Sequence, residues 1–487
     1  MSTFHVLNFG CRASFADGVA LRTQLVEAGL EEAGEANQSD LAVLNTCTVT
    51  SAADAEVRQV IRRIHRANPR CRILVTGCYA QRAPQEIAAL PGVAWVVGNS
   101  HKHSIAQLVT GVIPGCRRTP ADRGAAAQHN PATQAAEALP VESAEIYVGP
   151  IPDEFHFAPV SIAPADGDRT RPTLKIQDGC DARCSFCVIP YVRGGSRSLA
   201  PDQVVSQVRE LERCGFNEVV LSGINLGGYG RDLDRRITFL GILERILAET
   251  SIARLRISSI EPMDVTPEII RLAASEPRIA RHFHVPLQSG CDRILRLMNR
   301  RYWTIQYAER LLAIREGIPE CAIGADVMAG FPGETDGDHA VSLRFIEALP
   351  LTYAHVFPYS ARPSTAAATM SGQVNGRVAH ERGKEIRSLV AAKHRNFLAA
   401  QVGRTLSVLT LEDAEAHRLP EPREMGGGEL AAAGPGRSAG NIEPVALGLS
   451  SNYLRVVLPG AAVPRNTLLD AQIGRACDGF LYGRVVT

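Results

Sequence analysis

Apolar runs alternate with helical patterns along the N-terminal part of the chain. The runs at 4–9, 41–46 and 72–77 have the composition of buried strands. Each is followed by apolar positions at helical spacing, as in the segment from about 51 to 66. Strands that alternate with helices in this way predict an α/β domain, a parallel sheet with helices on both faces.

The same alternation continues in the middle of the chain. Strands are predicted at 173–177, 218–222, 254–258, 282–286, 322–328 and 353–358. Helical patterns lie between them, at 201–214, 239–249, 307–316 and 336–349. Six such units predict an open (β/α)6 partial barrel, whose active site is expected at the C-terminal ends of the strands.

The remaining segments lack this alternation. From about residue 398, strand patterns at 404–409, 452–458 and 479–486 predict a small antiparallel β-barrel domain, interrupted by a Gly/Ala-rich insertion at 425–440. The stretch 114–171 is rich in Ala, Pro and polar residues, as is typical of a partly disordered linker. The predicted domains are therefore 1–113, 172–397 and 398–487, with the linker between the first two.

Composition narrows the class of protein. At 487 residues the chain has room for about three domains. The net charge of +1 excludes a globally basic RNA binder and leaves open a local basic patch. No apolar run approaches the length of a membrane span and the N-terminus lacks a signal peptide, so a cytoplasmic location without membrane association is expected. The 12 cysteines then favour metal binding or catalysis over disulfides.

The clearest chemical motif is a CxxxCxxC loop formed by Cys180, Cys184 and Cys187. Three thiolates are one short of the four that usually hold an iron–sulfur cluster, so one iron would stay open to a small molecule. The alternatives are a zinc site or unrelated buried thiols. Zinc sites usually pair two CxxC units, and the chain has no second CxxC unit outside this loop.

A second set of cysteines follows the N-terminal strands. Cys11, Cys47 and Cys78 each come directly after a predicted strand, and the C-terminal ends of parallel strands gather on one edge of the sheet. A lone cysteine at such a place is usually a small buried residue. Three at equivalent positions predict a second three-thiolate cluster, whereas Cys71 and Cys116 are interpreted as structural or incidental.

Polar and glycine residues follow the barrel strands on the edge that carries the cysteine loop. Each of these turns is ordinary when taken singly, but their shared position favours a binding role for the cofactor. Glycine after the second strand allows close approach of a ligand, and hydroxyl and carboxylate groups after the third could hold a ribose. The candidate cofactor-binding residues are Gly223, Asn225, Ser258, Glu261 and Gln288.

With these motifs the chain resembles the radical S-adenosylmethionine methylthiotransferases, whose signature is CxxxCxxC. The resemblance covers nearly the whole chain and implies two 4Fe–4S clusters, on Cys11, Cys47 and Cys78 and on Cys180, Cys184 and Cys187, with S-adenosylmethionine as cofactor. The segments LSGINLGGYG at 221–230, ISSIEP at 257–262 and HVFPYSARP at 355–363 resemble the MtaB type. One departure is GCRASFAD at 10–17, where the family usually has GCKVNQYD.

The resemblance implies methylthiolation of N6-threonylcarbamoyladenosine at C2, at position 37 of tRNA. One cofactor molecule would methylate a sulfur held at the N-terminal cluster, and a second would be cleaved to a 5′-deoxyadenosyl radical that activates C2. An electron donor such as flavodoxin or ferredoxin is implied. The alternatives are isopentenyladenosine in tRNA, an aspartate of a ribosomal protein, or a non-enzymatic iron–sulfur or zinc protein.

RNA contacts are less well marked in the sequence. The family ends in a TRAM domain, a small β-barrel that holds RNA, while a barrel that only packs on the core is the alternative here. Basic side chains could hold tRNA phosphates, or simply form a solvated helix face. They are Arg58, Arg62, Arg63, Arg66, Arg70, Arg72, Arg300 and Arg301.

Overall fold

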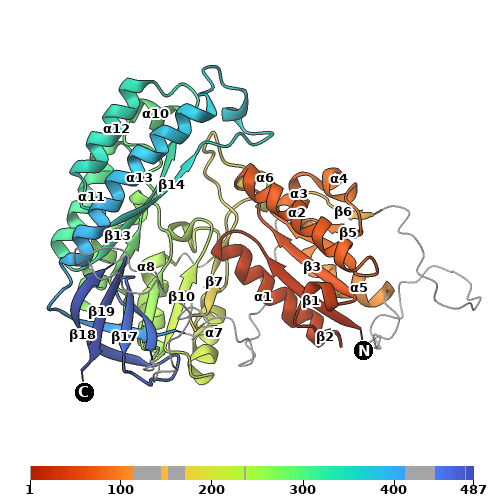
Figure 1. The fold of residues 1–487 in the computed structure, drawn as a ribbon, viewed down its shortest axis with the longest axis horizontal. Helices are drawn as coiled ribbons and strands as arrows, with labels where there is room; N and C mark the ends of the chain where they lie inside the picture. The colour runs from red at the N-terminus through yellow and green to blue at the C-terminus, as the bar shows by residue number, and fades with distance from the viewer. Residues whose placement is uncertain are drawn as a thin grey trace, which may run out of the picture.

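The computed structural model describes residues 2–112, 144–151, 170–234, 237–411, 445–477 and 479–486. Cys116, the insertion at 425–440 and most of the predicted linker lie outside these residues. Figure 1 shows the described chain as an N-terminal α/β part beside a crescent of strands and helices, with a small barrel at one end of the crescent.

The N-terminal part contains a parallel sheet in the order β2-β1-β3-β4-β5-β6. Its strands are β1 (Thr3–Asn8), β2 (Glu31–Glu32), β3 (Leu41–Thr46), β4 (Arg72–Gly77), β5 (Val93–Val97) and β6 (Glu145–Tyr147). The three strands predicted from the sequence are confirmed to within a residue at each end. β6 lies inside the stretch predicted as a linker, so that stretch contributes a strand to this sheet.

Helices cover both faces of this sheet, as predicted. Side chains alternate along a strand, so Val43 and Leu44 of β3 enter two different cores. Leu21 of α1 and Ile105 of α5 pack in the first core, and Ile61 of α2 packs in the second. The helices are α1 (Arg12–Glu27), α2 (Ser51–Ala67), α3 (Cys78–Arg82), α4 (Pro84–Ala88) and α5 (Ile105–Val112).

The middle part forms the predicted open barrel. Two parallel three-stranded sheets, β7-β10-β11 and β12-β13-β14, are joined by single parallel bridges, Leu255 to Ile279 and Ser259 to His284. The strands are β7 (Thr173–Lys175), β10 (Glu218–Ser222), β11 (Arg254–Ile257), β12 (His282–His284), β13 (Ala322–Ala329) and β14 (Tyr353–Pro358). A two-stranded hairpin, β8 (Gln177–Asp178) and β9 (Arg197–Ser198), flanks the cysteine loop.

Helices lie on the outside of this half-barrel and bury a continuous apolar core against it. They are α6 (Ile189–Arg193), α7 (Pro201–Arg213), α8 (Phe239–Glu249), α9 (Pro267–Ser275), α10 (Asp292–Leu297), α11 (Thr304–Gly317), α12 (Asp336–Ala348) and α13 (Gly376–Ala399). Short 3-10 turns complete the described chain: η1 (Ala36–Gln38), η2 (Asn99–Ser104), η4 (Leu226–Gly228), η5 (Pro262–Asp264) and η6 (Ala366–Thr369). Thr238 and Thr335 cap α8 and α12 by accepting backbone N–H groups.

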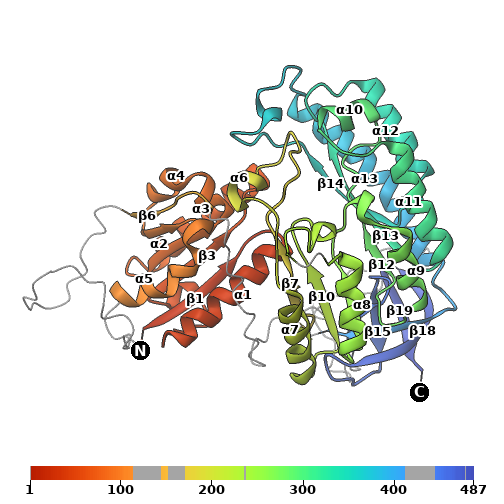
Figure 2. The same ribbon diagram turned by 180° about the vertical axis from the view of Figure 1, so that it is seen from behind.

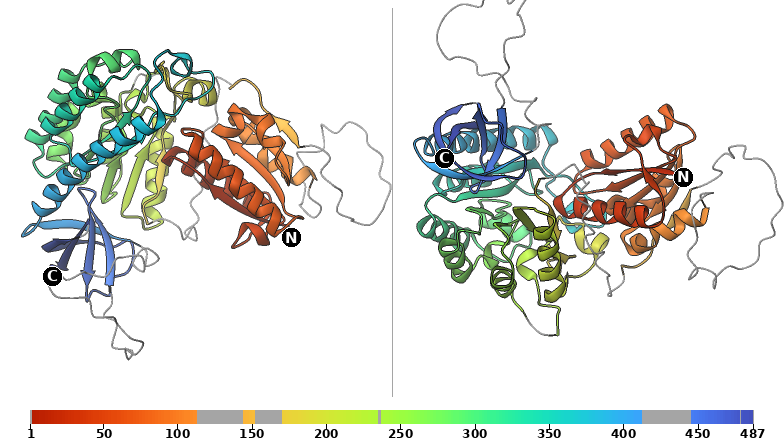
Figure 3. Two further views of the ribbon diagram at one scale, coloured as in Figure 1. Left: turned by 45° about the horizontal axis from the view of Figure 1, so that its top comes forward. Right: turned by 90° about the horizontal axis from the view of Figure 1, so that it is seen from below.

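α13 was not predicted, and it leads from the half-barrel into the C-terminal barrel (Figure 3). The closed barrel has the order β15-β16-β17-β19-β18 and is antiparallel except for the parallel pair β17–β19. Its strands are β15 (Thr405–Thr410), β16 (Val445–Ser450), β17 (Arg455–Pro459), β18 (Leu468–Cys477) and β19 (Phe480–Val485). The predicted small β-barrel is therefore confirmed, with two strands that the sequence pattern missed.

The three parts meet at the half-barrel. α1 packs against β7 and α3 against α6, so the N-terminal sheet lies beside the open edge of the barrel (Figure 2). At the start of the barrel strands, Arg254 and Arg256 of β11 donate hydrogen bonds to Leu449, Ser450 and Ser451 of the C-terminal barrel. The turn after β16 thus closes one end of the half-barrel.

Candidate active site at two cysteine triads

Cys11, Cys47 and Cys78 lie together at the C-terminal edge of the N-terminal sheet, as the strand order predicts. Cys11 precedes α1, Cys47 follows β3 and Cys78 begins α3. A hydrogen bond from the Cys47 thiol lowers the pKa of Cys11 to about 5, and Cys78 contributes to raising the pKa of Cys47. Gly10 (φ 103°) allows this approach, because a Cβ there would lie 2.2 Å from the Cys47 Cβ.

Cys180, Cys184 and Cys187 occupy the loop after β8. The Ala182 N–H donates to the Cys180 Sγ at 3.4 Å, and the Arg300 Nη1 donates to the Cys184 Sγ at 3.2 Å. Burial raises the pKa of Cys187 to about 12, and the neighbouring Cys184 and Cys180 add to that rise. A cation bound here would reverse this rise, because thiolates bind metals in the deprotonated form.

The sulfur spacing bears on the kind of metal centre. Within the described ranges, only His284, Asp326 and His355 bring three potential ligand atoms within 4.8 Å of one another. Neither cysteine triad does so. In each triad at least one pair of sulfur atoms is therefore more than 4.8 Å apart, while Cys11 and Cys47 are in hydrogen-bond contact. A single zinc ion with bonds of about 2.3 Å would draw its sulfur ligands to less than about 4 Å apart.

A buried guanidinium connects the two triads. The Arg193 Nε donates to the Cys78 Sγ at 3.2 Å, and its Nη1 donates to Asp178 at 2.9 Å, two residues before Cys180. The Arg193 Nη2 also donates to Asp17 at 2.9 Å. Arg193 is only 2% exposed, so it binds one thiol of the first triad and the strand that leads into the second.

Two lysines complete this network. Asp17 of α1 accepts hydrogen bonds from Lys102 at 3.1 Å and from Lys175, and Lys175 also donates to Asp178 at 2.9 Å. Burial alone raises the pKa of Asp178, but Arg193 and Lys175 lower that pKa to about 2. The network therefore holds charged groups of the N-terminal part and of the half-barrel together in a buried place.

Three of the five predicted cofactor-binding residues carry buried polar atoms that are left without partners. The Asn225 Oδ1, the Ser258 Oγ and the Gln288 Oε1 make no hydrogen bond to any described residue. Gln288 also has φ 64°, an uncommon backbone conformation for a residue with a side chain. Buried polar atoms without partners are rare in proteins, so these atoms fit a polar ligand such as S-adenosylmethionine.

The other two predicted residues are placed differently. Gly223 lies against Gln177, because a Cβ there would lie 2.9 Å from the Gln177 Oε1. Glu261 forms an ion pair with Arg300, which also contacts Cys184. Burial raises the pKa of Glu261. A cavity of about 200 Å³ is lined by Cys184, Asn225, Glu261 and Arg300, so these lie around one space, whereas Gly223, Ser258 and Gln288 do not line it.

The structure corrects part of the interpretation of the basic residues. Arg300 is buried and bound to Cys184 and Glu261, so the prediction that it holds RNA phosphates is wrong. Arg58 pairs with Glu86 and donates to Tyr79. The remaining predicted arginines of the N-terminal part are exposed: Arg62, Arg63, Arg66, Arg70 and Arg72. Cys71 is buried in the core of the N-terminal sheet, which confirms its structural role.

The sequence does not reveal the role of Arg193, because a lone arginine in a short helix carries no motif. Asp17 and Lys175 were missed for the same reason. One feature of the sequence does indicate such a cation. Asp178 stands two positions before Cys180, and a buried carboxylate needs a positively charged partner.

Two family models match the chain. Residues 3–98 match the model described as "Uncharacterized protein family UPF0004", and residues 174–346 match the "Radical SAM superfamily" model. The first match covers all three N-terminal cysteines, and the second begins in β7 and contains the CxxxCxxC loop.

Curated relatives align over most of the chain. The threonylcarbamoyladenosine tRNA methylthiotransferase MtaB of Bacillus subtilis is 34% identical over 99% of this chain and 96% of its own length. The MtaB of Aquifex aeolicus is 35% identical over 83% of this chain and 92% of its own length. The chain belongs to the MtaB-type methylthiotransferase family. A tRNA-2-methylthio-N(6)-dimethylallyladenosine synthase of Novosphingobium aromaticivorans is 32% identical over 84% of the chain and 86% of its own length.

Solved structures support the fold. The radical S-adenosylmethionine methyltransferase TsrM of Kitasatospora setae has a TM-score of 0.52 at 17% identity, covering 76% of this chain and 74% of that chain. The radical enzyme OxsB has a TM-score of 0.51 at 13% identity, covering 80% and 56%. At these identities the likeness concerns the arrangement of strands and helices alone.

As a member of this family, the chain is a radical S-adenosylmethionine methylthiotransferase, an enzyme that uses S-adenosylmethionine and a 4Fe–4S cluster. The unpartnered polar atom of Asn225, which lines the cavity beside Cys184, fits that cofactor. Among the described helices, none has the length and apolar character needed to cross a bilayer.

Proposed function

We propose that this enzyme transfers a methylthio group to C2 of N6-threonylcarbamoyladenosine at position 37 of tRNA. The observation that carries the proposal is the near-complete alignment with a relative named for this modified nucleoside. The presence of two cysteine triads, joined through Arg193, supports it further.

We assign a second 4Fe–4S cluster to Cys11, Cys47 and Cys78, and the radical cluster to Cys180, Cys184 and Cys187. When bound, the clusters and cofactor supply a methylated sulfur and a 5′-deoxyadenosyl radical, so that C2–H becomes C2–S–CH3 and the hydrogen leaves in 5′-deoxyadenosine. The protein's part is to hold these groups and exclude water. Arg193 fixes the spacing of the two triads, because it binds Cys78 and Asp178 with one rigid guanidinium.

We assign the cofactor to Gly223, Asn225, Ser258, Glu261 and Gln288. The unpartnered atoms of Asn225, Ser258 and Gln288 would accept or donate hydrogen bonds to its polar groups. Glu261 and Arg300 would orient the cofactor beside Cys184, since both line the cavity next to that thiol.

The remaining parts complete the proposed enzyme. tRNA is the macromolecular substrate, with the TRAM-like barrel at 398–487 and the exposed arginines of α2 as its contact surfaces. Flavodoxin or ferredoxin is the electron donor, and the cytoplasm is the location, because tRNA and such donors occur there. The functional units are 1–113, the radical core 172–397 and 398–487, with a linker at 114–171 that includes β6.

The test is a reconstitution with defined RNA. The anaerobically reconstituted enzyme is expected to hold about eight irons per chain and to convert threonylcarbamoyladenosine in tRNA to its 2-methylthio derivative, detected by nucleoside mass spectrometry. Threonylcarbamoyladenosine that stays unchanged while isopentenyladenosine or a ribosomal-protein aspartate is methylthiolated would overturn the substrate. About four irons, or failure to cleave S-adenosylmethionine under reduction, would overturn the two-cluster chemistry.

A further inference from the structure

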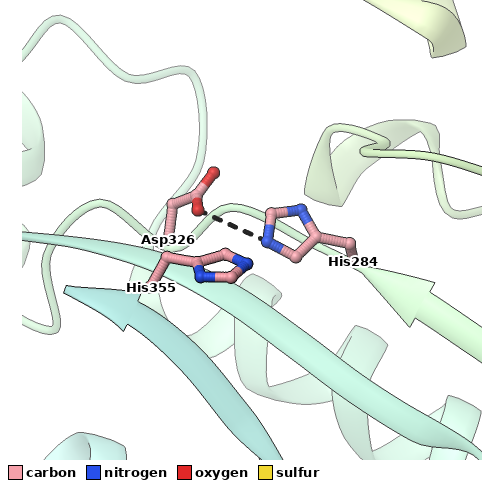
Figure 4. A group of neighbouring side chains, drawn as sticks. All are labelled: His284, Asp326 and His355. Atoms are coloured by element: carbon pink, nitrogen blue, oxygen red, sulfur yellow. Dashed lines mark ion pairs between the residues drawn. The ribbon is translucent and has the colours of Figure 1, made fainter. Parts of the chain in front are cut away.

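The interior of the half-barrel also holds a group of three polar side chains that has no part in the proposed cluster and cofactor sites. His284, Asp326 and His355 lie on the adjacent strands β12, β13 and β14, and Figure 4 shows their side chains turned toward one another. The His284 Nε2 lies 3.3 Å from the Asp326 Oδ1, and its Nδ1 lies 2.7 Å from the Ser259 Oγ. Ser259 stands between Ser258 and Glu261, so this group adjoins the predicted cofactor site.

The group is open to a ligand. His284 is buried, and its Nε2 makes no hydrogen bond to any residue that the structure describes, although it faces the Asp326 carboxylate. His355, by contrast, is exposed. A buried imidazole whose Nε2 faces a carboxylate without a hydrogen bond, next to an accessible second imidazole, is typical of a polar binding pocket.

Arg12 reaches the same interior from the N-terminal part. It directly follows Cys11, and its Nη2 donates to the Tyr453 hydroxyl of the C-terminal barrel at 2.9 Å. The Tyr453 ring stacks with the Tyr353 ring at 6.1 Å between centroids, and the Tyr353 ring lies 5.5 Å from that of His355 and 6.0 Å from that of His284. Arg12 therefore links the loop of the first triad with the His284–Asp326–His355 group.

The charge of Arg12 is not neutralised by the protein. No carboxylate forms an ion pair with it in the described ranges, and the side chain that accepts its hydrogen bond, Tyr453, is a phenol and not a carboxylate. Tyr453 itself has φ 65° and stacks on His282 with ring centroids 4.4 Å apart. A bulky residue in that backbone conformation is uncommon and is found where the fold must fix a side chain.

We propose that Arg12 and the His284–Asp326–His355 group form the pocket for the N6 substituent of the target adenosine. Arg12 binds the carboxylate of the threonyl group, and His284, Asp326 and His355 bind its urea N–H groups and hydroxyl. The inference rests on the proposed function. The inference also explains the choice of substrate in that function, because a purely hydrocarbon isopentenyl group would leave the same polar side chains without partners.

The position of the pocket agrees with the chemistry. The base must lie where both triads can reach it. The pocket has Arg12, next to Cys11, on one side and Ser259, next to the predicted cofactor-binding residue Ser258, on the other. A divalent cation is the rival occupant of the same three side chains, because two imidazoles and one carboxylate are a common metal-binding set.

The experiment compares two anticodon stem-loop RNAs. One carries threonylcarbamoyladenosine, and the other carries the same nucleoside with its carboxylate converted to a carboxamide. The wild-type enzyme is expected to favour the acid by about 100-fold in kcat/KM, the size of a lost charged hydrogen-bond pair. Arg12→Gln is expected to abolish this preference, and Arg12→Lys to keep part of it. Arg22→Gln, in the same helix and paired with Glu32 at the surface, is the matched control and should keep the full preference.

The outcomes separate this inference from the proposed function. A wild-type enzyme that does not modify the acid RNA overturns both. A wild-type enzyme that modifies acid and amide equally, or an Arg12→Gln enzyme that keeps the preference, overturns the pocket alone. One equivalent of zinc or another divalent metal beyond the cluster iron, lost in Asp326→Asn, would also overturn it, since the group would then be a metal site.

Discussion

Cys180, Cys184 and Cys187 come from one short loop of the half-barrel, whereas Cys11, Cys47 and Cys78 come from three loops at the edge of a sheet. The triad of Cys180, Cys184 and Cys187 depends on local spacing, and its main side-chain partner is Arg300. The dispersed triad depends on the parallel order β1-β3-β4, which brings together thiols that are far apart along the chain. Its main side-chain partner, Arg193, belongs to a different part of the protein.

This difference indicates how the two halves of the site are made stable. The local triad takes its three thiols from one loop, and that loop is held in place by hydrogen bonds from Asn299 and Arg300. The dispersed triad needs the sheet, and its approach to the half-barrel needs the network of Arg193, Asp17 and Lys175. We therefore expect the dispersed triad to be more sensitive to changes at the interface between the parts.

The largest expected effect separates the two triads directly. Cys184→Ala should abolish reductive cleavage of S-adenosylmethionine, because the cluster that binds it loses a ligand. Cys47→Ala should keep some cleavage but stop sulfur insertion. Each variant should lose about four of about eight irons. Product analysis for 5′-deoxyadenosine and the methylthiolated nucleoside measures both, and Cys71→Ala, outside both triads, is the control. Equal loss of cleavage in the two variants would contradict separate roles.

Arg193→Gln tests the interface. Both carboxylates that it binds are buried, at 6% exposure for Asp17 and 2% for Asp178, so the loss should destabilise the protein by about 3 kcal/mol. The content of bound iron should decrease mainly at the dispersed triad, because Cys78 loses its hydrogen bond. Denaturant unfolding and iron analysis measure this. Arg213→Gln, which breaks a surface pair with Glu210, should change stability by less than about 0.5 kcal/mol. An Arg193→Gln protein with unchanged stability and iron would show that the network is dispensable.

Acid stability tests the opposite end of the half-barrel, where no cysteine triad lies. Burial alone raises the pKa of Glu218, but Arg256, with Arg171 and Arg254, lowers that pKa to about 2. Because the folded pKa is below the unfolded value of about 4.3, the stabilisation is complete above about pH 4.3 and is lost as the pH falls toward 2.

The measurable consequence is a difference between the wild type and Glu218→Gln. The stability advantage of the wild type should shrink by on the order of 2 kcal/mol between about pH 6 and about pH 3. Thermal unfolding across this range measures it, with Glu244→Gln at an exposed position of α8 as control. A constant difference at every pH would mean that Glu218 is not held ionised by these arginines.

The smallest expected effect concerns the local triad. Arg300→Gln removes the N–H donor to Cys184 and the ion pair with Glu261, while all three thiols stay in place. Cofactor cleavage should slow by about tenfold, the effect of one charged hydrogen bond, with iron content unchanged. Arg271→Gln, at an exposed position of α9 where the arginine pairs with Glu268, should stay within about twofold. Loss of iron in Arg300→Gln would show that the local triad also depends on a distant residue.

Much of the fold was predictable from the sequence. The strands 218–222 and 353–358 and the helix 239–249 agree residue for residue with β10, β14 and α8, because their apolar patterns are strong and bounded by turn residues. β2 and β6 are very short, and their pairing with the rest of the sheet depends on backbone hydrogen bonds that leave no side-chain pattern. α13 was missed because its apolar positions face two different neighbours, the strands β13 and β14 and the helix α12.

The active site, like the fold, was predictable from the sequence only in part. The CxxxCxxC spacing and the position of each N-terminal cysteine after a strand are properties of the sequence, and they predicted which thiols gather. The roles of Arg193 and Arg300 were hidden, and Arg300 was grouped with the side chains that could hold RNA phosphates, because charge alone does not reveal whether a side chain is buried. Both arginines reach sulfur atoms that are more than 100 positions away in the chain.

The sequence by itself determined the two sets of three thiols and the order of strands that gathers them, since local spacing and periodic burial are written residue by residue. Only the tertiary structure decided what joins the two triads and what lines the space between them. The contacts of Arg193 with Cys78 and Asp178, and of Arg12 with Tyr453, join distant segments. They exist because packing removes water from these places, and a buried charge must then be met by a partner that only the fold can bring near.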